Sequence, residues 1–367
     1  MKPKAEDLAY MEMAFSLAEK ARGRTSPNPC VGAVLVRDGR IVGWGYHQEA
    51  GQPHAEIIAL ERAGEKVRGA TLYLTLEPCV HWGRTPPCVD RLVKAGLKRV
   101  VIASSDPNPI VHEKGIARLR QTGLEVITGI LAEKNQHLNE AYNKYIVHKT
   151  PFVTLKFATS LDGKMATSSG DSRWISSEES RRMVQHLRYE HDAILVGAGT
   201  VLRDNPSLSL RLENARKKRW FRVVLDTRLS VPPEARLLQN PEEGHVLIFS
   251  GPEAPPEKIK ALQDRGAEII ITDTENGQIN LKQVLRTLGQ REISALLVEG
   301  GAKVLTSFLE QKLADKVIAF LAPRLIGGEK SPSPFAGRGF FSLAEAPELK
   351  NIKHLRLKND IMIEGYL

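Results

Sequence analysis

One histidine and two cysteines stand where they could bind a metal ion together. His54 opens a predicted helix, Cys79 follows a predicted strand, and Cys88 opens the next predicted helix. An imidazole and two thiolates give zinc three protein ligands and leave one position open, which is typical of catalytic rather than structural zinc. Because a helix N-terminus favours the thiolate form of cysteine, the spacing predicts one catalytic zinc ion per chain.

Glu56 lies two residues after His54 and is predicted to move protons rather than to bind the metal. A carboxylate beside an activated water can take its proton and deliver it to a leaving amine. This His-x-Glu…Pro-Cys pattern is typical of base deaminases. The alternative is a core histidine with two buried cysteines, but Pro-Cys at a strand end and Cys88 at a helix start favour zinc. Cys30 stands in an apolar run and is predicted to belong to the core.

The second half contains two glycine-rich turns, of which the first holds Gly197 and Gly199. These glycines follow a predicted strand at residues 193–196. The dinucleotide-binding fingerprint requires a third glycine and a following helix. The chain lacks that glycine and continues into residues 203–206, where we expect no helix. The pattern therefore argues against a dinucleotide fingerprint at this turn.

The second turn, at Gly300 and Gly301, is better placed to bind a phosphate. It lies between a predicted strand at 295–298 and a predicted helix at 303–311. Backbone amides at such a helix N-terminus can hold a phosphate, and glycine allows the ligand to approach closely. A simple turn without a ligand is the alternative.

Arg188 and Arg211 could also bind phosphate, because a planar guanidinium group does so in bidentate fashion. Arg188 lies on a predicted helix and Arg211 follows a predicted loop, with the strand at 193–196 between them in the sequence. Helix and loop could therefore converge at one end of a sheet. The alternative for each arginine is a surface position or an ion pair.

The elements that must position these residues alternate between strands and helices in both halves. Such alternation predicts an α/β fold with helices on both faces of each sheet. The first half has predicted strands at 31–36, 41–45, 71–76, 100–103 and 124–128, and predicted helices near 54–63, 88–95, 115–121 and 131–147. The second half has predicted strands at 152–157, 193–196, 223–226, 245–249, 268–271, 295–298 and 316–320.

A domain boundary is predicted at residues 148–151, where the last helix of the first half ends before Pro151. A chain of 367 residues is long enough for two domains. We therefore expect one domain at residues 1–148 and a second at residues 149–367.

Composition and charge exclude several classes of protein. Hydrophobic residues make up 42% of the chain and charged residues 26%, and no apolar run reaches the length of a membrane span. The net charge of +9 invites a nucleic-acid partner, but basic residues are spread over both halves and aromatic residues reach only 6%. A diffuse positive charge equally suits a small phosphorylated substrate. Three cysteines and no apolar leader lead us to expect a cytoplasmic enzyme without membrane or nucleic-acid partners.

Several motifs together resemble the bifunctional riboflavin-biosynthesis deaminase–reductase family. They are Asn-Pro-Cys-Val-Gly-Ala-Val at residues 28–34, His-Ala-Glu at 54–56, and Leu-Glu-Pro-Cys-Val-His-Trp-Gly-Arg-Thr-Pro-Pro-Cys at 76–88. Cytidine and transfer-RNA deaminases usually have two residues between their paired cysteines, whereas eight separate these two. Val80 and the pair at 112–113 depart from the family pattern, but neither is a proposed ligand.

The second half resembles the reductase part of the same family, from Pro151 to the C-terminus. The similar segments are residues 156–164, 172–175, 197–202 and 298–302. The resemblance implies a cytidine-deaminase-like α/β/α domain followed by a dihydrofolate-reductase-like α/β domain. It also implies a hydrolase and an oxidoreductase activity, with zinc and NADPH as cofactors and a phosphorylated pyrimidine as substrate.

The resemblance also implies roles for individual residues. The residues expected to contact NADPH are Ala158, Trp174, Thr200, Asp204 and Gly301. Those expected to contact the deaminase substrate are Asn28 and His47 at the pyrimidine, and His81 and Arg84 at its polar or phosphate end. Those expected to contact the reductase substrate are Ser172, Arg188, Leu208, Arg211 and Glu299. We further expect the chain to form a homo-oligomer.

Two other functions are compatible with parts of the sequence. One is a zinc-dependent nucleic-acid base deaminase with an RNA-binding second domain, which predicts a clustered basic and aromatic surface. The other is a non-catalytic protein in which zinc serves the fold. Glu56 counts against the latter, because a folding zinc would not require it.

Overall fold

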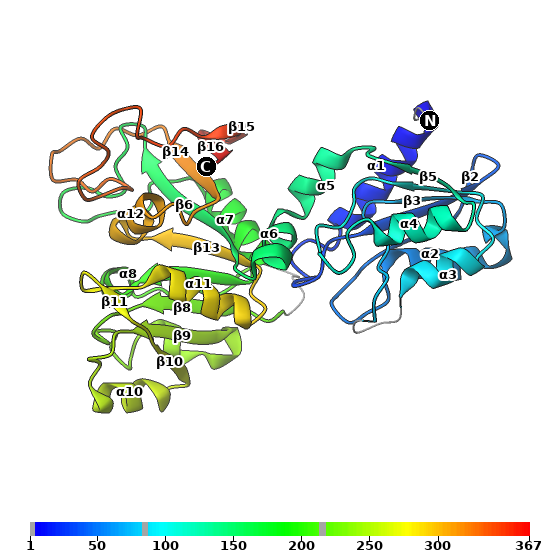
Figure 1. Ribbon diagram of the computed structural model, residues 1–367. Helices are drawn as coiled ribbons and strands as arrows, with labels where there is room; N and C mark the ends of the chain where they lie inside the picture. The colour runs from blue at the N-terminus through cyan, green and yellow to red at the C-terminus, as the bar shows by residue number, and fades with distance from the viewer. Residues whose placement is uncertain (1–3, 83–86, 213–217) are drawn as a thin grey trace. The chain divides into compact units, whose positions relative to one another are not determined.

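The computed structural model describes residues 4–82, 87–212 and 218–367 (Figure 1). The chain forms two compact units, Met1–Lys149 and Thr150–Leu367. Among the described residues, no helix has the length and apolar character that crossing a membrane would require.

The first unit contains a five-stranded sheet in the order β2-β1-β3-β4-β5. Strands β2, β1 and β3 pair antiparallel, whereas β3, β4 and β5 pair parallel. The strands are β1 (Gly32–Arg37), β2 (Arg40–Tyr46), β3 (Thr71–Leu74), β4 (Arg99–Ile102) and β5 (Glu125–Thr128). The helices are α1 (Ala5–Glu19), α2 (Ala55–Ala63), α3 (Cys88–Lys94), α4 (Lys114–Gln121), α5 (Ala132–Leu138) and α6 (Glu140–His148), with a short 3₁₀ turn at Gly64–Val67.

Helices cover both faces of this sheet. Successive side chains of a strand point to opposite faces, and in β1 the side chains on both faces are apolar and packed against helices. Leu35 packs with α2, α3 and α4 on one face, while its neighbour Val34 packs with α1 on the other. Helix α2 lies directly against β2, because a Cβ atom at Gly45 would stand only 2.4 Å from the carbonyl oxygen of Ala55. Glycine at this position therefore lets α2, which carries Glu56, approach the sheet closely.

The second unit contains a nine-stranded sheet in the order β10-β9-β8-β7-β13-β6-β14-β16-β15. Its strands run parallel from β10 to β14, and the last two pair antiparallel. These strands are β6 (Phe152–Ser160), β7 (Ala193–Gly197), β8 (Phe221–Leu225), β9 (His245–Ser250), β10 (Ala267–Ile271), β13 (Ala295–Gly300), β14 (Lys316–Ala322), β15 (Lys350–Leu357) and β16 (Asp360–Tyr366). A separate small hairpin joins β11 (Thr274–Glu275) and β12 (Gln278–Ile279).

Helices also cover both faces of the larger sheet. Leu195 of β7 packs with α11 and α12, while Ile194 and Val196 face a second cluster that includes α8, α9 and α10. The helices are α7 (Glu178–Glu190), α8 (Ala198–Asp204), α9 (Arg236–Gln239), α10 (Pro256–Gln263), α11 (Leu281–Gln290) and α12 (Ala302–Glu310), with a 3₁₀ turn at Pro241–Glu243. The predicted α/β class is confirmed in both units.

Two local expectations are wrong. The stretch 131–147 is not one helix but α5 and α6, which meet at Asn139 (φ −112°, ψ 23°). There the Asn139 side chain bonds the backbone of Cys30, 109 residues away, a contact that local periodicity does not reveal.

A helix does follow Gly197, because residues 198–204 form α8 before the chain turns at Asn205.

Candidate zinc centre and reductase site

The three predicted zinc ligands lie together. His54 is the N-cap of α2, Cys88 is the first residue of α3, and Cys79 lies in the loop after β3. His54 Nδ1 stands 3.0 Å from Cys88 Sγ and 3.7 Å from Cys79 Sγ, and all three ligand atoms lie within 4.8 Å of one another. Tetrahedral zinc separates nitrogen and sulfur ligands by roughly 3.5–3.8 Å. The donor set therefore fits a zinc ion, with the His54–Cys79 separation inside this range and the His54–Cys88 separation shorter.

The two sulfurs shift each other's pKa in opposite directions. A hydrogen bond with Cys88 lowers the pKa of Cys79 to about 4, while the contact with Cys79 and burial raise the pKa of Cys88. The pKa of His54 is raised, chiefly by its contact with Cys79. Two adjacent thiolates repel unless a cation lies between them, so this pair favours a metal as its neutralising partner.

Glu56 lies in the first turn of α2, where only 3% of its surface is exposed. Burial raises its pKa, and the charge of His54 opposes that rise. The fold therefore holds a carboxyl group next to the zinc ligands, as the spacing predicts, in a place where bulk water does not compete for its proton.

Asn28 and His47 lie beside this centre. The His47 ring stands edge-on to His54 with ring centroids 5.3 Å apart. His47 Nδ1 is 3.2 Å from the carbonyl oxygen of Pro53, and Nε2 is 3.1 Å from Asn28 Nδ2. Burial lowers the pKa of His47 to about 4, so the ring is neutral at pH 7: Nδ1–H donates to Pro53 and Nε2 accepts from Asn28.

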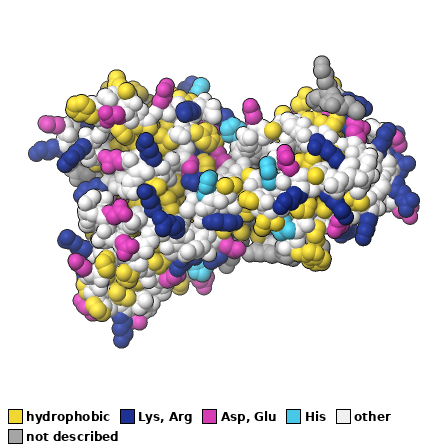
Figure 2. All heavy atoms as spheres, viewed as in Figure 1, with side chains coloured by type: hydrophobic (Ala, Val, Ile, Leu, Met, Phe, Trp, Pro, Cys, Tyr) yellow, Lys and Arg dark blue, Asp and Glu magenta, His cyan; other side chains and the backbone are white. Residues whose placement is uncertain are grey.

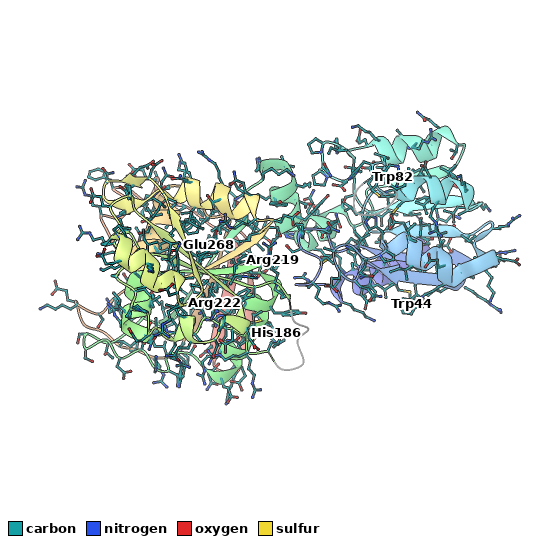
Figure 3. All side chains as sticks on the ribbon, turned by 90° about the horizontal axis from the view of Figure 1, so that it is seen from below. Trp44, Trp82, His186, Arg219, Arg222 and Glu268 are labelled. Atoms are coloured by element: carbon teal, nitrogen blue, oxygen red, sulfur yellow. The ribbon has the colours of Figure 1, made fainter. Side chains whose placement is uncertain are left out.

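The expected contacts at the other end of the deaminase substrate are only partly described. His81 is half-buried, and its Nδ1 atom has no hydrogen-bond partner among the described residues. Its neighbour Trp82 is exposed (Figure 3). Arg84, the other residue expected there, lies outside the described residues.

Two buried acids beside the zinc centre were not among the candidates. The carboxylate of Glu77, two residues before Cys79, accepts backbone N–H bonds from Asp106, Glu113 and Ile116. Asp106 in turn accepts from the Tyr142 hydroxyl, and burial raises its pKa to about 6. Glu77 could have been identified from the sequence, because an acidic residue at the end of an apolar strand is unusual.

Two of the predicted NADPH contacts follow the carboxyl ends of neighbouring parallel strands, where α/β sheets bind their ligands. Thr200 follows β7, and its Oγ1 accepts a 3.0 Å hydrogen bond from the backbone of Gly301, which follows β13. Arg173 donates to the carbonyl oxygen of Asp204 at 3.0 Å, and the adjacent Trp174 is exposed. Ala158 lies in β6, the next strand after β13. Two helix-starting turns thus meet at this edge, which fits a phosphate-bearing cofactor.

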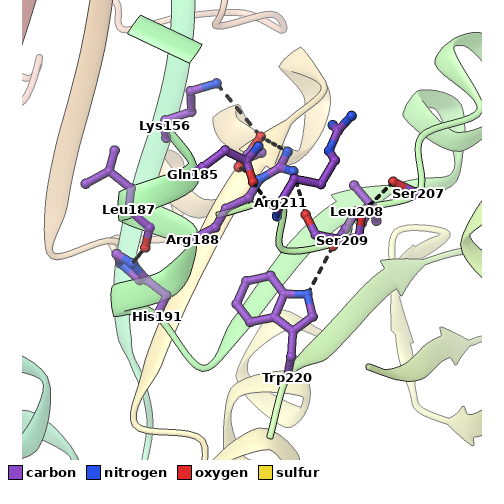
Figure 4. Close-up of polar contacts among 11 residues, drawn as sticks. Lys156, Gln185, Leu187, Arg188, His191, Ser207, Leu208, Ser209, Arg211 and Trp220 are labelled. Carbon is purple, nitrogen blue, oxygen red and sulfur yellow. Dashed lines mark hydrogen bonds and ion pairs between the residues drawn. The ribbon is translucent and has the colours of Figure 1, made fainter. Parts of the chain in front are cut away.

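A buried charge cluster lies beside this edge (Figure 4). Arg188 binds the Glu299 carboxylate in bidentate fashion, with Nε–Oε1 at 2.7 Å and Nη2–Oε2 at 2.9 Å. Lys156 Nζ lies 3.8 Å from Glu299 Oε2. Burial alone would raise the pKa of Glu299, but the two cations lower it to about 2, and burial lowers the pKa of Lys156. Lys156 was missed as a candidate, although a lysine in an apolar strand was a visible signal.

The loop before Arg211 is held against α7, so the expected convergence of helix and loop is confirmed. Arg188 Nη1 donates to the carbonyl oxygen of Ser209, and the Arg211 backbone donates to Gln185 (Figure 4). Leu208 has a left-handed backbone (φ 54°), and its carbonyl oxygen accepts from the Trp220 indole. The Arg211 side chain itself is exposed. Ser172 is half-buried in the segment before α7, where its carbonyl oxygen accepts from Ile175.

Comparison with known proteins identifies both halves. A model of the cytidine and deoxycytidylate deaminase zinc-binding region matches residues 4–104, and a model of the RibD C-terminal domain matches residues 151–363. A riboflavin biosynthesis protein RibD from Aquifex aeolicus (strain VF5) is 44% identical over 357 residues, covering 97% of each chain. The chain belongs to the RibD family.

Other RibD proteins extend this similarity to solved structures. The Escherichia coli (strain K12) RibD protein is 39% identical over 366 residues, covering 95% of this chain and 97% of the relative. Acinetobacter baumannii RibD (form 1) has a TM-score of 0.87 at 38% identity, over 98% of both chains. A diaminohydroxyphosphoribosylaminopyrimidine deaminase/5-amino-6-(5-phosphoribosylamino)uracil reductase from Thermotoga maritima has a TM-score of 0.85 at 38% identity, again over 98% of both.

Membership of the RibD family confirms the expected class of enzyme. The chain is a bifunctional riboflavin-biosynthesis enzyme with a zinc-dependent deaminase region and an NADPH-dependent reductase region. Its expected fold, a deaminase-like domain before a reductase-like domain, is confirmed too. The alternative of a nucleic-acid deaminase with an RNA-binding half is not supported, because RibD relatives match both halves.

Proposed function

We propose that residues 1–148 deaminate 2,5-diamino-6-(5-phosphoribosylamino)pyrimidin-4(3H)-one and that residues 149–367 then reduce its ribosyl group to ribityl phosphate with NADPH. The observation that carries this proposal is the grouping of His54, Cys79 and Cys88 beside buried Glu56. Three ligands and an adjacent carboxyl group are the parts that hydrolytic removal of an amine needs. On the described face in Figure 2, lysine and arginine side chains are scattered among acidic ones rather than gathered in one stripe, which suits a small substrate.

In the deaminase step, the side chains orient the pyrimidine and move protons. When bound by its three ligands, zinc supplies Lewis-acid activation of the attacking water. Glu56 takes the proton of that water and delivers it to the departing amine, which leaves as ammonia. The neutral His47 ring and the Asn28 amide, hydrogen-bonded to each other, hold the pyrimidine against this face.

In the reductase step, NADPH supplies the hydride. Opening the ribosyl ring breaks the C1′–O4′ bond, forms a C=N bond from the nitrogen lone pair, and requires a proton on O4′. Lys156, whose pKa is lowered by burial, donates this proton, and Glu299 holds the lysine in place. Hydride then adds to C1′.

Two different roles follow for the arginines. The guanidinium of Arg188 already binds Glu299 and Ser209, so it positions the acid and the substrate loop. Arg211, whose side chain is exposed on that loop, binds the substrate phosphate.

The two reactions can be tested in sequence with the full-length chain. We expect ammonia to be released from the phosphorylated diaminopyrimidinone in a zinc-dependent manner, and NADPH to be oxidised only after that release. NADPH oxidation with the undeaminated compound would contradict the order. Absence of ammonia release from the zinc-loaded protein would overturn the deaminase assignment.

We also propose that the chain self-associates through β15. This strand forms one edge of the large sheet, and among the described strands none pairs with its outer side. Seven of its eight residues are exposed, including Ile352 at 60%. An unpaired edge strand with apolar side chains is a template for pairing with another copy. Sedimentation should show a dimer that Ile352→Lys weakens; a wild-type monomer at all concentrations would overturn this proposal.

A further inference from the structure

Three buried polar residues line one side of the helix pair α5–α6. They are Asn135, Asn139 and Tyr142, spaced by four and three residues, with 2%, 3% and 8% of their surfaces exposed. We call these three residues the polar stripe. Residues at such spacing face the same way on a helix. A helix pair that merely covered the fold would bury apolar side chains here, because buried polar groups cost free energy unless they are hydrogen-bonded.

Asn139 holds the segment that carries Asn28. Its Oδ1 accepts from the Cys30 backbone N–H at 2.7 Å, and its Nδ2 donates to the Cys30 carbonyl oxygen at 3.0 Å. The next residue, Val31, accepts the backbone N–H of His47 at 2.9 Å. One amide side chain thus fixes the backbone between Asn28 and His47.

Asn135 holds the loop after β4, which in turn contacts the segment before Cys79. Its Nδ2 donates to Ser104 Oγ at 2.6 Å, and its Oδ1 accepts from Asn139 Nδ2 at 2.9 Å. The Ser104 carbonyl oxygen accepts from the backbone of Glu77 at 3.0 Å. Glu77 precedes Cys79 by two residues, so this bond supports the loop that carries the ligand.

Tyr142 holds the same loop two residues further on, at Asp106. Its hydroxyl lies 2.9 Å from Asp106 Oδ1 and 3.1 Å from Oδ2, and donates to this carboxylate. The backbone of Asp106 donates to the Glu77 carboxylate at 3.0 Å. The Tyr142 and Asn135 contacts therefore both reach Glu77 through this loop.

We propose that the polar stripe positions two loops of the deaminase site and, through the second of them, the segment that carries Cys79, so that α5–α6 belongs to the deaminase rather than serving as a linker. Asn139 bonds the loop that carries Asn28, while Asn135 and Tyr142 both bond the loop after β4, which holds Asp106 and contacts the Glu77–Cys79 segment. The stripe lies outside residues 4–104, the matched zinc-binding region, and outside residues 151–363, the matched reductase domain. The helix break at Asn139 is where this amide reaches Cys30. This inference rests on the proposed deamination and adds the residues that hold the Asn28–His47 face in position for the substrate.

The first test compares Asn139→Ala with Asn143→Ala in the full-length chain. Asn143 is the same residue type one turn further along α6, and its Oδ1 has no hydrogen-bond partner among the described residues. Loss of a group that orients a site residue costs roughly 10- to 100-fold in activity. We expect Asn139→Ala to lose about that much deaminase kcat/KM, mainly through KM, with zinc content and reductase activity kept. Asn143→Ala should stay within about twofold of wild type.

The split between KM and kcat separates positioning from mere stability. A variant that is only less stable contains less active enzyme, so its apparent kcat falls while its KM stays the same. A loosened Asn28–His47 face binds the pyrimidine more weakly and raises KM. Equal effects of the two asparagine variants, or an unchanged KM in Asn139→Ala, would overturn the inference.

Tyr142→Phe provides a second test that keeps the ring and removes only the hydroxyl. We expect it to retain zinc and reductase activity and to lose deaminase kcat/KM by roughly 10-fold. Unchanged deamination in this variant would contradict the role of Tyr142 even if Asn139→Ala failed to fold. Wild-type ammonia release decides the proposed function separately, since these variants are judged only by their ratio to wild type.

Discussion

The zinc centre and the reductase site balance buried charge in opposite ways. In the zinc centre, two sulfurs and Glu56 gather, and among the described residues no lysine or arginine forms an ion pair with that carboxyl group. In the reductase site, Glu299 is paired with Arg188 and Lys156 from the chain itself. The zinc centre therefore needs a metal cation to balance its negative charge, whereas the reductase site balances its buried charges with its own side chains.

Removing the metal is the strongest way to test this contrast. Cys79→Ser and Cys88→Ser should each lose the single zinc ion and with it deamination, because a hydroxyl does not replace a thiolate ligand. The reductase should still oxidise NADPH with deaminated substrate, since its charges are balanced internally. Metal analysis and the two separate assays check this.

Cys30→Ser is the matched control, because Cys30 is buried among Ala18 and Ala21 and lies outside the ligand group. It should keep zinc and deamination. Loss of zinc in Cys30→Ser would show that the ligand set is wrong, and loss of reductase activity on zinc removal would break the contrast between the two sites.

Glu56→Gln should separate metal binding from proton transfer. The amide has almost the same shape but cannot accept the proton, so deamination should fall by about 10²- to 10⁴-fold, the usual contribution of a positioned acid–base group. Zinc content and reduction of pre-deaminated substrate should not change. The measurement is ammonia release at saturating substrate, and wild-type rates in this variant would rule out Glu56 as the proton carrier.

In the reductase site, Arg211→Ala should have a smaller effect. A charge-assisted hydrogen bond contributes about 1.5–3 kcal/mol, which corresponds to roughly 10- to 150-fold weaker substrate binding. Arg211→Lys should recover only part of this loss, because an ammonium lacks the bidentate fork. NADPH affinity should change little, since Thr200 and Gly301 are assigned to the cofactor.

The informative control for Arg211 is substrate without its phosphate. Wild type should bind it weakly, and Arg211→Ala should make little further difference. An equal loss for both substrates would mean that Arg211 does not bind the phosphate. A selective loss of NADPH affinity would mean that the substrate and cofactor ends of the site are exchanged.

The difference between the zinc centre and the reductase site also explains which site residues could be predicted from the sequence. Zinc ligands must be particular side chains, so His54, Cys79 and Cys88 were visible as residue types before any contact was known. The proposed reductase site includes the turn at Gly301, whose amide donates to Thr200, and a charge pair, Arg188–Glu299, whose members are 111 residues apart. Nothing local in the sequence joins that pair.

The helices and strands show the same difference between features that leave a local sequence pattern and features that depend on distant contacts. Apolar runs predicted the strands of both sheet centres, where burial on two faces leaves a clear pattern. Strand β15 was not predicted, because nearly all of its residues are exposed and no apolar run marks it. The break between α5 and α6 was not predicted either, since it depends on the distant Cys30 backbone.

The smallest expected effect concerns a charge pair in the first unit that is balanced internally, as in the reductase site. Asp7 and Arg99 are buried and form two hydrogen bonds, at 2.7 and 2.8 Å, and Tyr73 donates to the same carboxylate. Burial alone would raise the pKa of Asp7, but Arg99, the Lys4 backbone and Tyr73 lower it to about 2. Since the unfolded chain binds this proton at about pH 3.9, the pair stabilises the fold above that pH. Its contribution is lost as the pH falls towards 2.

Asp7→Asn removes this titration and provides the comparison. Between pH 5 and pH 3 the wild type should lose about 1 kcal/mol of stability relative to the variant, because the unfolded state gains a proton that the folded state still excludes. Calorimetry of the full chain can follow the transition of the first unit, identified at pH 7 as the one that zinc removal lowers. A wild-type advantage that stayed constant over this range would mean that Asp7 is not held ionised. Internal charge balance would then be confined to the reductase unit.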